Sequence, residues 1–251
     1  MNRPYANLAR FYELLVPGVP EMNRIARETI LGQRLRRIGS ACDLACGNGA
    51  TAIDLARRGL AVHAVDNSPV FLRAARANAQ RAGVRVRVQR ADMRAFRLPE
   101  AVDLLLCEFA ALNNLDRRAD LPRVLRCAAR AVRPGGILLF DVNTPHSFAT
   151  QIPRGEWVER PEFKLVMRGT PHERHLGADL HLEWFLPRNG GYRHVRESIR
   201  HVAWTEAEIR RALRTAGFGR IRTFDGADVR PESMGTPRGT DLYVLAERIE
   251  R

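Results

Sequence analysis

The distribution of apolar and polar residues predicts a chain that begins with two helices and then alternates strands with helices. Residues 5–16 and 20–37 have helical periodicity, with a Pro/Gly-rich break between them. Seven segments with strand character follow, namely residues 41–45, 60–65, 84–90, 101–107, 137–142, 218–224 and 241–247. Because helical segments follow the first, second and fourth of these strands, the pattern predicts an α/β fold with a doubly wound, mostly parallel sheet.

Local signals support these boundaries. Ser68 followed by Pro69 is typical of the start of a helix. Thr205 and Glu208 have the spacing of a capping box, which predicts another helix start. The two final strands, joined by a Gly/Pro-rich loop over residues 225–239, are expected to form a hairpin that completes a seven-stranded sheet.

Residues 155–204 interrupt the alternation, because they contain little helical periodicity. Residues 163–168 and 192–204 have strand character, and Asn189-Gly190 is a strong hairpin signal. The strand between them has large apolar residues at alternate positions, namely Leu180, Leu182, Trp184 and Leu186. These patterns predict an antiparallel β insert of about three strands after the fifth strand, covering the carboxyl edge of the main sheet.

The length and composition favour one domain with an insertion over two domains. The chain has 251 residues, and the 45% that are hydrophobic are enough to form a substantial core. The predicted organisation is a helical cap at residues 1–38, an α/β domain at 39–146 and 205–251, and the β insert, or lid, at 147–204.

The charge and the cysteines bear on partners and location. The net charge of +13 allows a nucleic-acid or acidic partner, but the arginines are scattered and Lys164 is the only lysine. The chain has no apolar run long enough to span a membrane and no signal-peptide core, and its four cysteines form no CxxC pair. We therefore expect a cytoplasmic protein with reduced thiols and no metal site, either a monomer or a homodimer.

The segment Asp43-Leu44-Ala45-Cys46-Gly47-Asn48-Gly49 carries the first chemical signal. Its two glycines allow a sharp turn and a close approach of the backbone to a ligand. The same glycines fit the dinucleotide pattern G-x-G-x-x-A, and Asp66 lies 19 positions beyond Gly47, as in nicotinamide enzymes. A nicotinamide oxidoreductase is therefore one alternative.

Three further motifs follow in order: Val65-Asp66-Asn67-Ser68, Ala91-Asp92-Met93 and Arg133-Pro134-Gly135-Gly136. Together with the glycine segment, they make the chain resemble the class I S-adenosylmethionine-dependent methyltransferases over residues 40–145, and more loosely to its end. The resemblance implies a Rossmann-like methyltransferase fold whose α/β domain binds S-adenosyl-L-methionine.

The resemblance also implies roles for the motif residues. Asp43 would help to hold the amino-acid end of the cofactor, Asp66 the ribose hydroxyls and Asp92 the adenine amine. The remaining residues implied to bind the cofactor are Ala45, Cys46, Gly47, Asn48, Gly49, Asn67, Met93, Cys107, Glu108 and Phe109.

The acceptor would be a small molecule methylated on N or O, because the insert resembles the lids of small-molecule methyltransferases. Glu108 and His146 are the candidates for acceptor contact or base catalysis. The candidates for acceptor binding are Asn113, Asn143, His181, Glu183 and Arg196, the last three on an insert face expected to look down on the sheet. An RNA- or protein-directed methyltransferase and a non-catalytic S-adenosylmethionine-binding protein remain alternatives.

Overall fold

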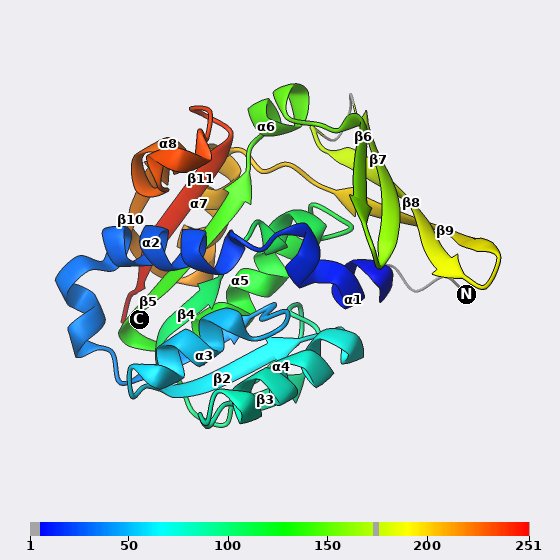
Figure 1. Ribbon diagram of the computed structural model, residues 1–251. Helices are drawn as coiled ribbons and strands as arrows, with labels where there is room; N and C mark the ends of the chain where they lie inside the picture. The colour runs from blue at the N-terminus through cyan, green and yellow to red at the C-terminus, as the bar shows by residue number, and fades with distance from the viewer. Residues whose placement is uncertain (1–5, 173–175, 251) are drawn as a thin grey trace.

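A computed structural model describes residues 6–172 and 176–250. Its larger sheet has seven strands in the order β10-β11-β5-β4-β1-β2-β3 (Figure 1). The strands are β1 (Ser40–Leu44), β2 (Ala61–Asp66), β3 (Arg87–Arg90), β4 (Val102–Cys107), β5 (Val132–Asn143), β10 (Phe218–Asp225) and β11 (Asp241–Arg248). The first five are parallel, and β11 runs antiparallel to both β5 and β10. The predicted fold class and the closing hairpin are confirmed.

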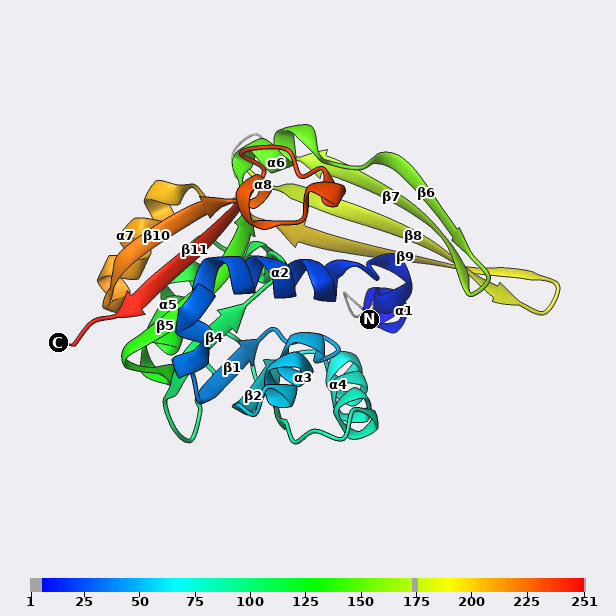
Figure 2. The same ribbon diagram turned by 60° about the vertical axis from the view of Figure 1, so that its left-hand side comes forward.

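Helices cover both faces of this sheet (Figures 1 and 2). One apolar core lies under α5 (Asp120–Ala131) and α7 (Glu206–Ala216). The other core lies under α2 (Val19–Leu31), α3 (Ala50–Arg57), α4 (Pro69–Arg81) and α8 (Gly226–Val229). Among the described residues, no helix combines the length and the apolar character needed to cross a bilayer.

The helix starts follow the sequence signals. The Ser68 hydroxyl accepts a hydrogen bond from the N–H of Phe71 at the start of α4. Thr205 and Glu208 form the predicted capping box at the start of α7. The helix expected over residues 20–37 is shorter, because α2 gives way at Gly32, whose φ is 51°, to the 3-10 helix η1 (Gly32–Arg37). Residue 5, where the first helix was expected to begin, lies outside the described residues.

The insert is a separate antiparallel sheet of four strands in the order β6-β7-β8-β9. The strands are β6 (Arg154–Arg160), β7 (Phe163–Pro171), β8 (Ala178–Arg188) and β9 (Gly191–His201). Three strands were expected. The additional strand is β6, which carries no strand signal because residues Arg154 to Arg160 are all partly or fully exposed and show no apolar alternation.

One face of the insert sheet packs on α1 (Ala6–Leu15), which lies between this sheet and α4 (Figure 2). The ring of Phe11 on α1 meets Phe163 and Trp184, with centroids 4.7 Å and 5.6 Å apart. On the other side of α1, the ring of Tyr12 meets Phe71 of α4 at 5.4 Å. The N-terminal helix therefore connects the insert to the carboxyl edge of the main sheet.

Candidate active site

The loop between β1 and α3 has a backbone that depends on glycine. Gly47 and Gly49 have φ angles of 54° and 82°, and Ala45 at the end of β1 has a φ of 59°. A Cβ on Gly49 would lie 3.0 Å from the Cβ of Ala75 and 3.2 Å from its Cα. Neither contact can be relieved by a flexible side-chain end, so the loop packs against α4 only with glycine there.

Two carboxylates stand at the ends of β1 and β2. Asp43 is buried and accepts a hydrogen bond from the N–H of Ala52 at 3.1 Å, and burial raises its pKa to about 8. The oxygens of Asp66 accept from the N–H groups of Gly47 at 3.0 Å and Ser68 at 2.8 Å, and burial raises its pKa. A carboxylate has about four acceptor positions, so Asp66 retains acceptor capacity for a ligand beyond its backbone hydrogen bonds.

Asp92 and Met93 emerge beside Asp66 and Asn67, because β2 and β3 are neighbouring parallel strands. The carboxylate of Asp92 is already paired with Arg94, whose Nη2 donates at 2.6 Å, and this hydrogen bond lowers the pKa of Asp92. Met93 is half-buried against the core, and Asn67 is exposed. The chain thus brings the three predicted acids to neighbouring strand ends, while their individual contacts with a cofactor stay predictions.

Glu108, directly after β4, is held in a buried ion pair. Its oxygens accept from Nη1 of Arg27 at 2.7 and 3.0 Å and from the Thr51 hydroxyl at 2.7 Å. The side chains of Arg27 and Glu108 are 1% and 7% exposed, and Arg27 also pairs with Asp54 at 2.7 Å. With both oxygens engaged in this way, Glu108 is better suited to holding α2 against the site than to accepting a proton.

The chain leaves β4 through a strained turn. Phe109 and Ala110 have φ angles of 60° and 52°, a conformation that non-glycine residues keep only where their surroundings hold it, often at ligand sites. The ring of Tyr12 approaches that of Phe109 edge-on, with centroids 6.2 Å apart. Cys107 and Cys46 are buried, and burial raises the pKa of both thiols, which makes them poor nucleophiles.

A second cluster, which the sequence analysis missed, surrounds Asp141 of β5. Its Oδ2 accepts from the N–H of Ala110 at 2.8 Å, whereas Oδ1 has no hydrogen-bond partner among the described residues. Burial raises the pKa of Asp141 to about 7, although the guanidinium of Arg230, 3.9 Å away, opposes this shift. Nε of Arg230 donates to the Tyr243 hydroxyl at 3.0 Å. Burial and the charge of Asp141 raise the pKa of Tyr12.

The sequence contained a signal for this cluster. Asp141 is the only charged residue in the apolar segment 137–142, and a charge in a buried strand requires a local partner or a function. Arg27 gives the same kind of signal on α2, where it is buried alongside Ala26 and Ile30.

The side-chain amide of Asn113, expected to contact the acceptor, is engaged with the backbone, and its contact with an acceptor stays a prediction. Its amide oxygen accepts from the N–H of Asn143 at 2.9 Å. Its amide nitrogen donates to the carbonyls of Asn143 at 2.9 Å and Val202 at 2.8 Å, which occupies both N–H groups. Asn113 therefore ties the end of β5 to the chain that leaves the insert. Asn143 is half-buried at the end of β5, and its role in acceptor binding stays a prediction.

The insert is oriented opposite to expectation. His181, Glu183 and Arg196 lie on the face turned away from α1, because the alternate residues Leu182 and Trp184 pack in one cluster with Phe11. The apolar side chains determine which face of the insert sheet packs inward, because burying apolar surface is more favourable than burying the polar side chains. His181, Glu183 and Arg196 thus do not face the main sheet as expected, and their contacts with the acceptor stay predictions that this orientation does not favour.

His146 is exposed on α6 (Pro145–Thr150). It lies beside Gly239, where an added Cβ would stand 3.6 Å from the imidazole ring. His146 is therefore exposed to solvent, whereas Glu108 is held in a buried ion pair. Catalysis by Glu108 or His146 stays a prediction, and the geometry favours Asp141 over both.

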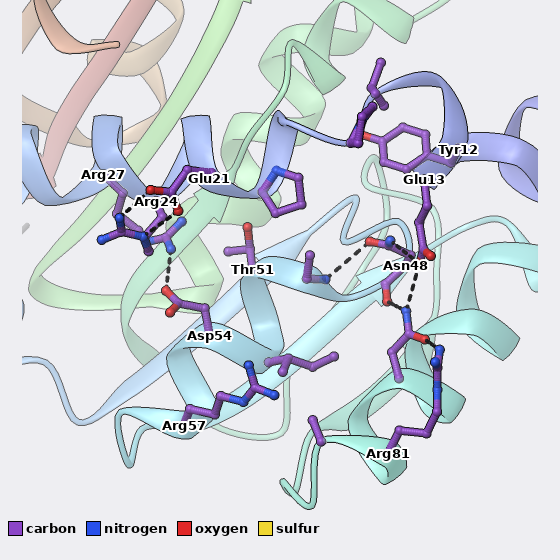
Figure 3. Close-up of a pocket in the computed structure, with 17 residues that line it drawn as sticks. Tyr12, Glu13, Glu21, Arg24, Arg27, Asn48, Thr51, Asp54, Arg57 and Arg81 are labelled. Atoms are coloured by element: carbon purple, nitrogen blue, oxygen red, sulfur yellow. Dashed lines mark hydrogen bonds and ion pairs between the residues drawn. The ribbon is translucent and has the colours of Figure 1, made fainter. Parts of the chain in front are cut away.

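A cavity of about 690 Å³ opens between the N-terminal helices and helices α3 and α4 (Figure 3). It shares Tyr12, Arg27, Asn48 and Thr51 with the site described above. Asn48 donates from its amide to Glu13 of α1 at 2.9 Å, so the glycine loop and α1 meet at this cavity. Asp43, Asp66 and Asp92 are not among its lining residues. The cavity therefore shares residues with the site but does not include its three strand-end acids.

Comparisons with known proteins agree with this arrangement. Residues 41–136 match a family model described as a methyltransferase domain. A ubiquinone biosynthesis O-methyltransferase of Xanthomonas euvesicatoria pv. vesicatoria (strain 85-10) is 30% identical over 153 residues, which cover 59% of this chain and 60% of that protein. The chain thus matches less than two thirds of the length of this curated relative.

Two solved structures have a similar fold over nearly the whole chain. An S-adenosylmethionine-dependent methyltransferase from Clostridium acetobutylicum ATCC 824 has a TM-score of 0.81 and 17% identity, and the match covers 98% of this chain and 99% of that one. The S-adenosylmethionine-bound amino pentose methyltransferase CalS10 from Micromonospora echinaspora has a TM-score of 0.68 and 22% identity, covering 94% and 96%. At these identities, the likeness concerns the fold.

Proposed function

We propose that this member of the class I S-adenosylmethionine-dependent methyltransferase superfamily transfers a methyl group to the nitrogen of a small-molecule amine. Its membership, predicted from the four sequence motifs, is confirmed by the family match over residues 41–136 and by the fold. The activity and the class of acceptor are our proposal, because the chain covers 60% of the O-methyltransferase it resembles.

The side chains at the carboxyl edge suit S-adenosylmethionine. This cofactor carries a sulfonium, an ammonium, a carboxylate and two ribose hydroxyls, so it needs several acceptors and one cationic donor. Asp66 keeps free acceptor positions for hydroxyls, and Asp43 offers a carboxylate to the amino-acid end. Nε of Arg27 is buried and has no hydrogen-bond partner among the described residues, which leaves a donor for a carboxylate. When bound, the cofactor supplies a methyl group activated by a positively charged sulfur.

Asp141 is the observation that carries the choice of an amine. Its buried Oδ1 has no partner among the described residues, and its pKa lies near 7. A buried carboxylate attracts an ammonium, and it can remove the proton that an ammonium must lose before its nitrogen accepts a methyl group. An aliphatic alcohol is a far weaker acid, so a carboxylate with this pKa would not deprotonate it.

The remaining residues of the cluster have supporting roles. Arg230, held by Tyr243 and by Asp241 at 2.8 Å, fixes the environment of Asp141. Tyr12 and Phe109 place two aromatic rings in edge-to-face contact beside the turn that follows β4. The acceptor nitrogen then approaches the methyl group with its lone pair free, and Asp141 retains the proton. Holding the two reactants close together supplies much of the rate acceleration.

The names of similar proteins do not decide between oxygen and nitrogen. The curated relative is named for O-methylation, whereas CalS10 is named for an amino pentose. The test is therefore direct. The purified chain would be incubated with methyl-labelled S-adenosylmethionine and matched panels of amino sugars, other small amines and phenols, and the labelled products would be identified by mass spectrometry.

We expect labelled amines, and we expect Asp141→Asn to lower their turnover by roughly 10²–10⁴-fold while S-adenosylhomocysteine still binds. Asp116→Asn, which changes a carboxylate whose side chain is 70% exposed, is the matched control and should leave turnover unchanged. Methylation of phenols alone, or full activity of Asp141→Asn, would refute the amine assignment. Binding of NAD without binding of S-adenosylhomocysteine would refute the methyltransferase proposal as a whole.

A further inference from the structure

The helix α4 and the edge strand β3 carry a dense group of arginines at one edge of the main sheet (Figure 1). Residues 69–100 contain eight arginines, no lysine and two acids, Asp92 and Glu100, so this segment holds a net charge of +6 out of the +13 of the chain. Arg94 is paired with Asp92 and Asp120. The other seven arginines are exposed, and with Glu100 they form the basic ridge: Arg73, Arg76, Arg81, Arg85, Arg87, Arg90 and Arg97.

The charge of the basic ridge is uncompensated within the part of the chain that the structure describes. None of its seven arginines forms an ion pair there, and three of them donate only to neutral carbonyl or amide oxygens. Glu13 of α1 reaches α4, but it accepts there from the Asn78 amide at 3.4 Å. Surface arginines elsewhere do pair with acids, as Arg24 does with Glu21. The shortage of acids is therefore a local property of this edge.

Protection of an open sheet edge does not account for the whole ridge. Charged side chains on an edge strand hinder its pairing with other chains, and Arg87 on β3 can serve in this way. Arg73 and Arg76 lie on α4, however, where no strand edge is open. Solubility is served equally well by interspersed acids and bases, with less self-repulsion. A concentration of one sign therefore indicates a partner of the opposite sign.

The shape of the ridge indicates which polyanion it fits. Val88 packs against the core under α4, so its neighbour Arg87 points to the opposite face of the sheet. Arg76 extends from α4 to the carbonyl oxygen of Val88 at 3.4 Å, so the positive charge wraps around the edge. A flat membrane would meet one side only. Within residues 69–100, all of which the structure describes, no large apolar side chain is exposed to anchor the chain in lipid.

We propose that the basic ridge docks double-stranded nucleic acid through its phosphate backbone. Guanidinium groups bind phosphates through paired hydrogen bonds, and such contacts give affinity without a preference for sequence. Proteins that bind single strands stack the bases on aromatic side chains. The two aromatic residues of this segment do not offer such a platform, because Phe71 is half-buried and Phe96 is buried.

The bound duplex is not the methyl acceptor of the proposed reaction. In the main sheet, β3 is separated from β5, which carries Asp141, by four strand spacings, or about 19 Å. Docking would therefore hold the enzyme on a nucleic acid while the strand ends remain available to a small amine. It does not depend on the proposed reaction, and its test uses binding alone.

Fluorescence anisotropy of a short labelled DNA duplex with the purified full chain tests the proposal. At physiological salt we expect a Kd of about 10⁻⁶–10⁻⁴ M, and the logarithm of the association constant should fall with the logarithm of salt by roughly 0.9 for each phosphate contact. The ridge variant combines Arg73→Gln, Arg85→Gln and Arg87→Gln. It should bind roughly tenfold more weakly or worse, and its salt slope should be smaller by about 3, with unchanged circular dichroism.

A second triple variant controls for the high charge of the whole chain. Arg126→Gln, Arg211→Gln and Arg214→Gln remove the same charge from exposed positions on α5 and α7. This control should stay within about threefold of the wild-type affinity, because its arginines lie outside the ridge. Equal weakening by the two triple variants, or an unchanged salt slope in the ridge variant, would overturn the proposal.

Hydrogen exchange of the wild-type protein locates the contact. Adding the DNA duplex should slow exchange in α4 and β3 and leave β6 to β9 unchanged. Protection confined to other elements would overturn the proposal. Vesicles of phosphatidylglycerol serve as the competing anionic surface. If they displace the duplex at an equal concentration of phosphate and protect the same two elements, the ridge belongs to a lipid surface and the proposal is wrong.

Discussion

Arg27 is the side chain on which the packing of α2 against the site depends most. It is 1% exposed and donates to both oxygens of Glu108 and to Asp54. Arg27→Met keeps the length and most of the apolar contacts but removes the charge. It leaves Glu108, 7% exposed, without its counter-ion beside Asp43, a carboxyl whose pKa burial already raises to about 8.

Breaking a buried ion pair from one side costs about 3–5 kcal/mol, because the remaining charge is left unpaired in a poorly solvated position. For a chain of 251 residues, this loss corresponds to a fall in Tm of roughly 6–20 °C. Replacing Glu108 by Gln in the same chain should recover most of the loss, because the unpaired charge is then removed while the Thr51 hydroxyl keeps an acceptor.

Guanidinium unfolding of the wild type, the two single variants and the double variant measures this coupling. Arg24→Met, on the same helix, is the control: its ion pairs with Glu21 and Glu28 are at the surface, so its loss should be a small fraction of that for Arg27→Met. A loss below about 1 kcal/mol for Arg27→Met, or additive effects in the double variant, would refute the reasoning.

Three further predictions concern the residues at the strand ends. Asp66→Ala should weaken binding of S-adenosylhomocysteine by about 1–3 kcal/mol in titration calorimetry, and unchanged affinity would contradict the ribose assignment. Gly49→Ala should destabilise the chain more than Gly59→Ala in thermal unfolding, because both positions have positive φ but an added Cβ meets Ala75 only at Gly49; equal losses would show that the close approach is unimportant. Folding raises the pKa of Asp141 to about 7, so the stability from its protonated form is present below about pH 4 and lost as pH rises through 7. Asp141→Asn should therefore gain stability relative to wild type between pH 4 and 8, by at most about 4 kcal/mol, and a pH-independent difference in unfolding free energy would contradict the shifted pKa.

The sequence was sufficient for the main sheet because each strand carries its own signal. The nearly all-apolar β4 indicates a strand covered on both faces, and the alternation of polar residues through Arg87 and Gln89 indicates an exposed edge, where β3 lies. The ordered motifs placed Asp43, Asp66 and Asp92 at neighbouring strand ends for the same reason: parallel strands bring their carboxyl ends to one edge.

The parts that could not be predicted depend on contacts between distant segments. Alternation in β8 shows that one face is apolar, but the direction of that face is set by Phe11, which lies far away in the sequence. The partners of Glu108 come from α2 and α3, and those of Asp141 come from the turn after β4 and the segment after α8. The residue type and the position after a strand could therefore indicate that Glu108 has a role at the site. They could not show that both of its carboxylate oxygens accept hydrogen bonds from Arg27.

A crystal structure of the full chain with S-adenosylhomocysteine tests the central claim most directly. The account predicts that the ribose hydroxyls lie within hydrogen-bond distance of Asp66, with the amino-acid end between Asp43 and Arg27. A nucleoside seated in the cavity between the N-terminal helices and helices α3 and α4 (Figure 3), or anywhere else away from the ends of β1 and β2, would contradict it.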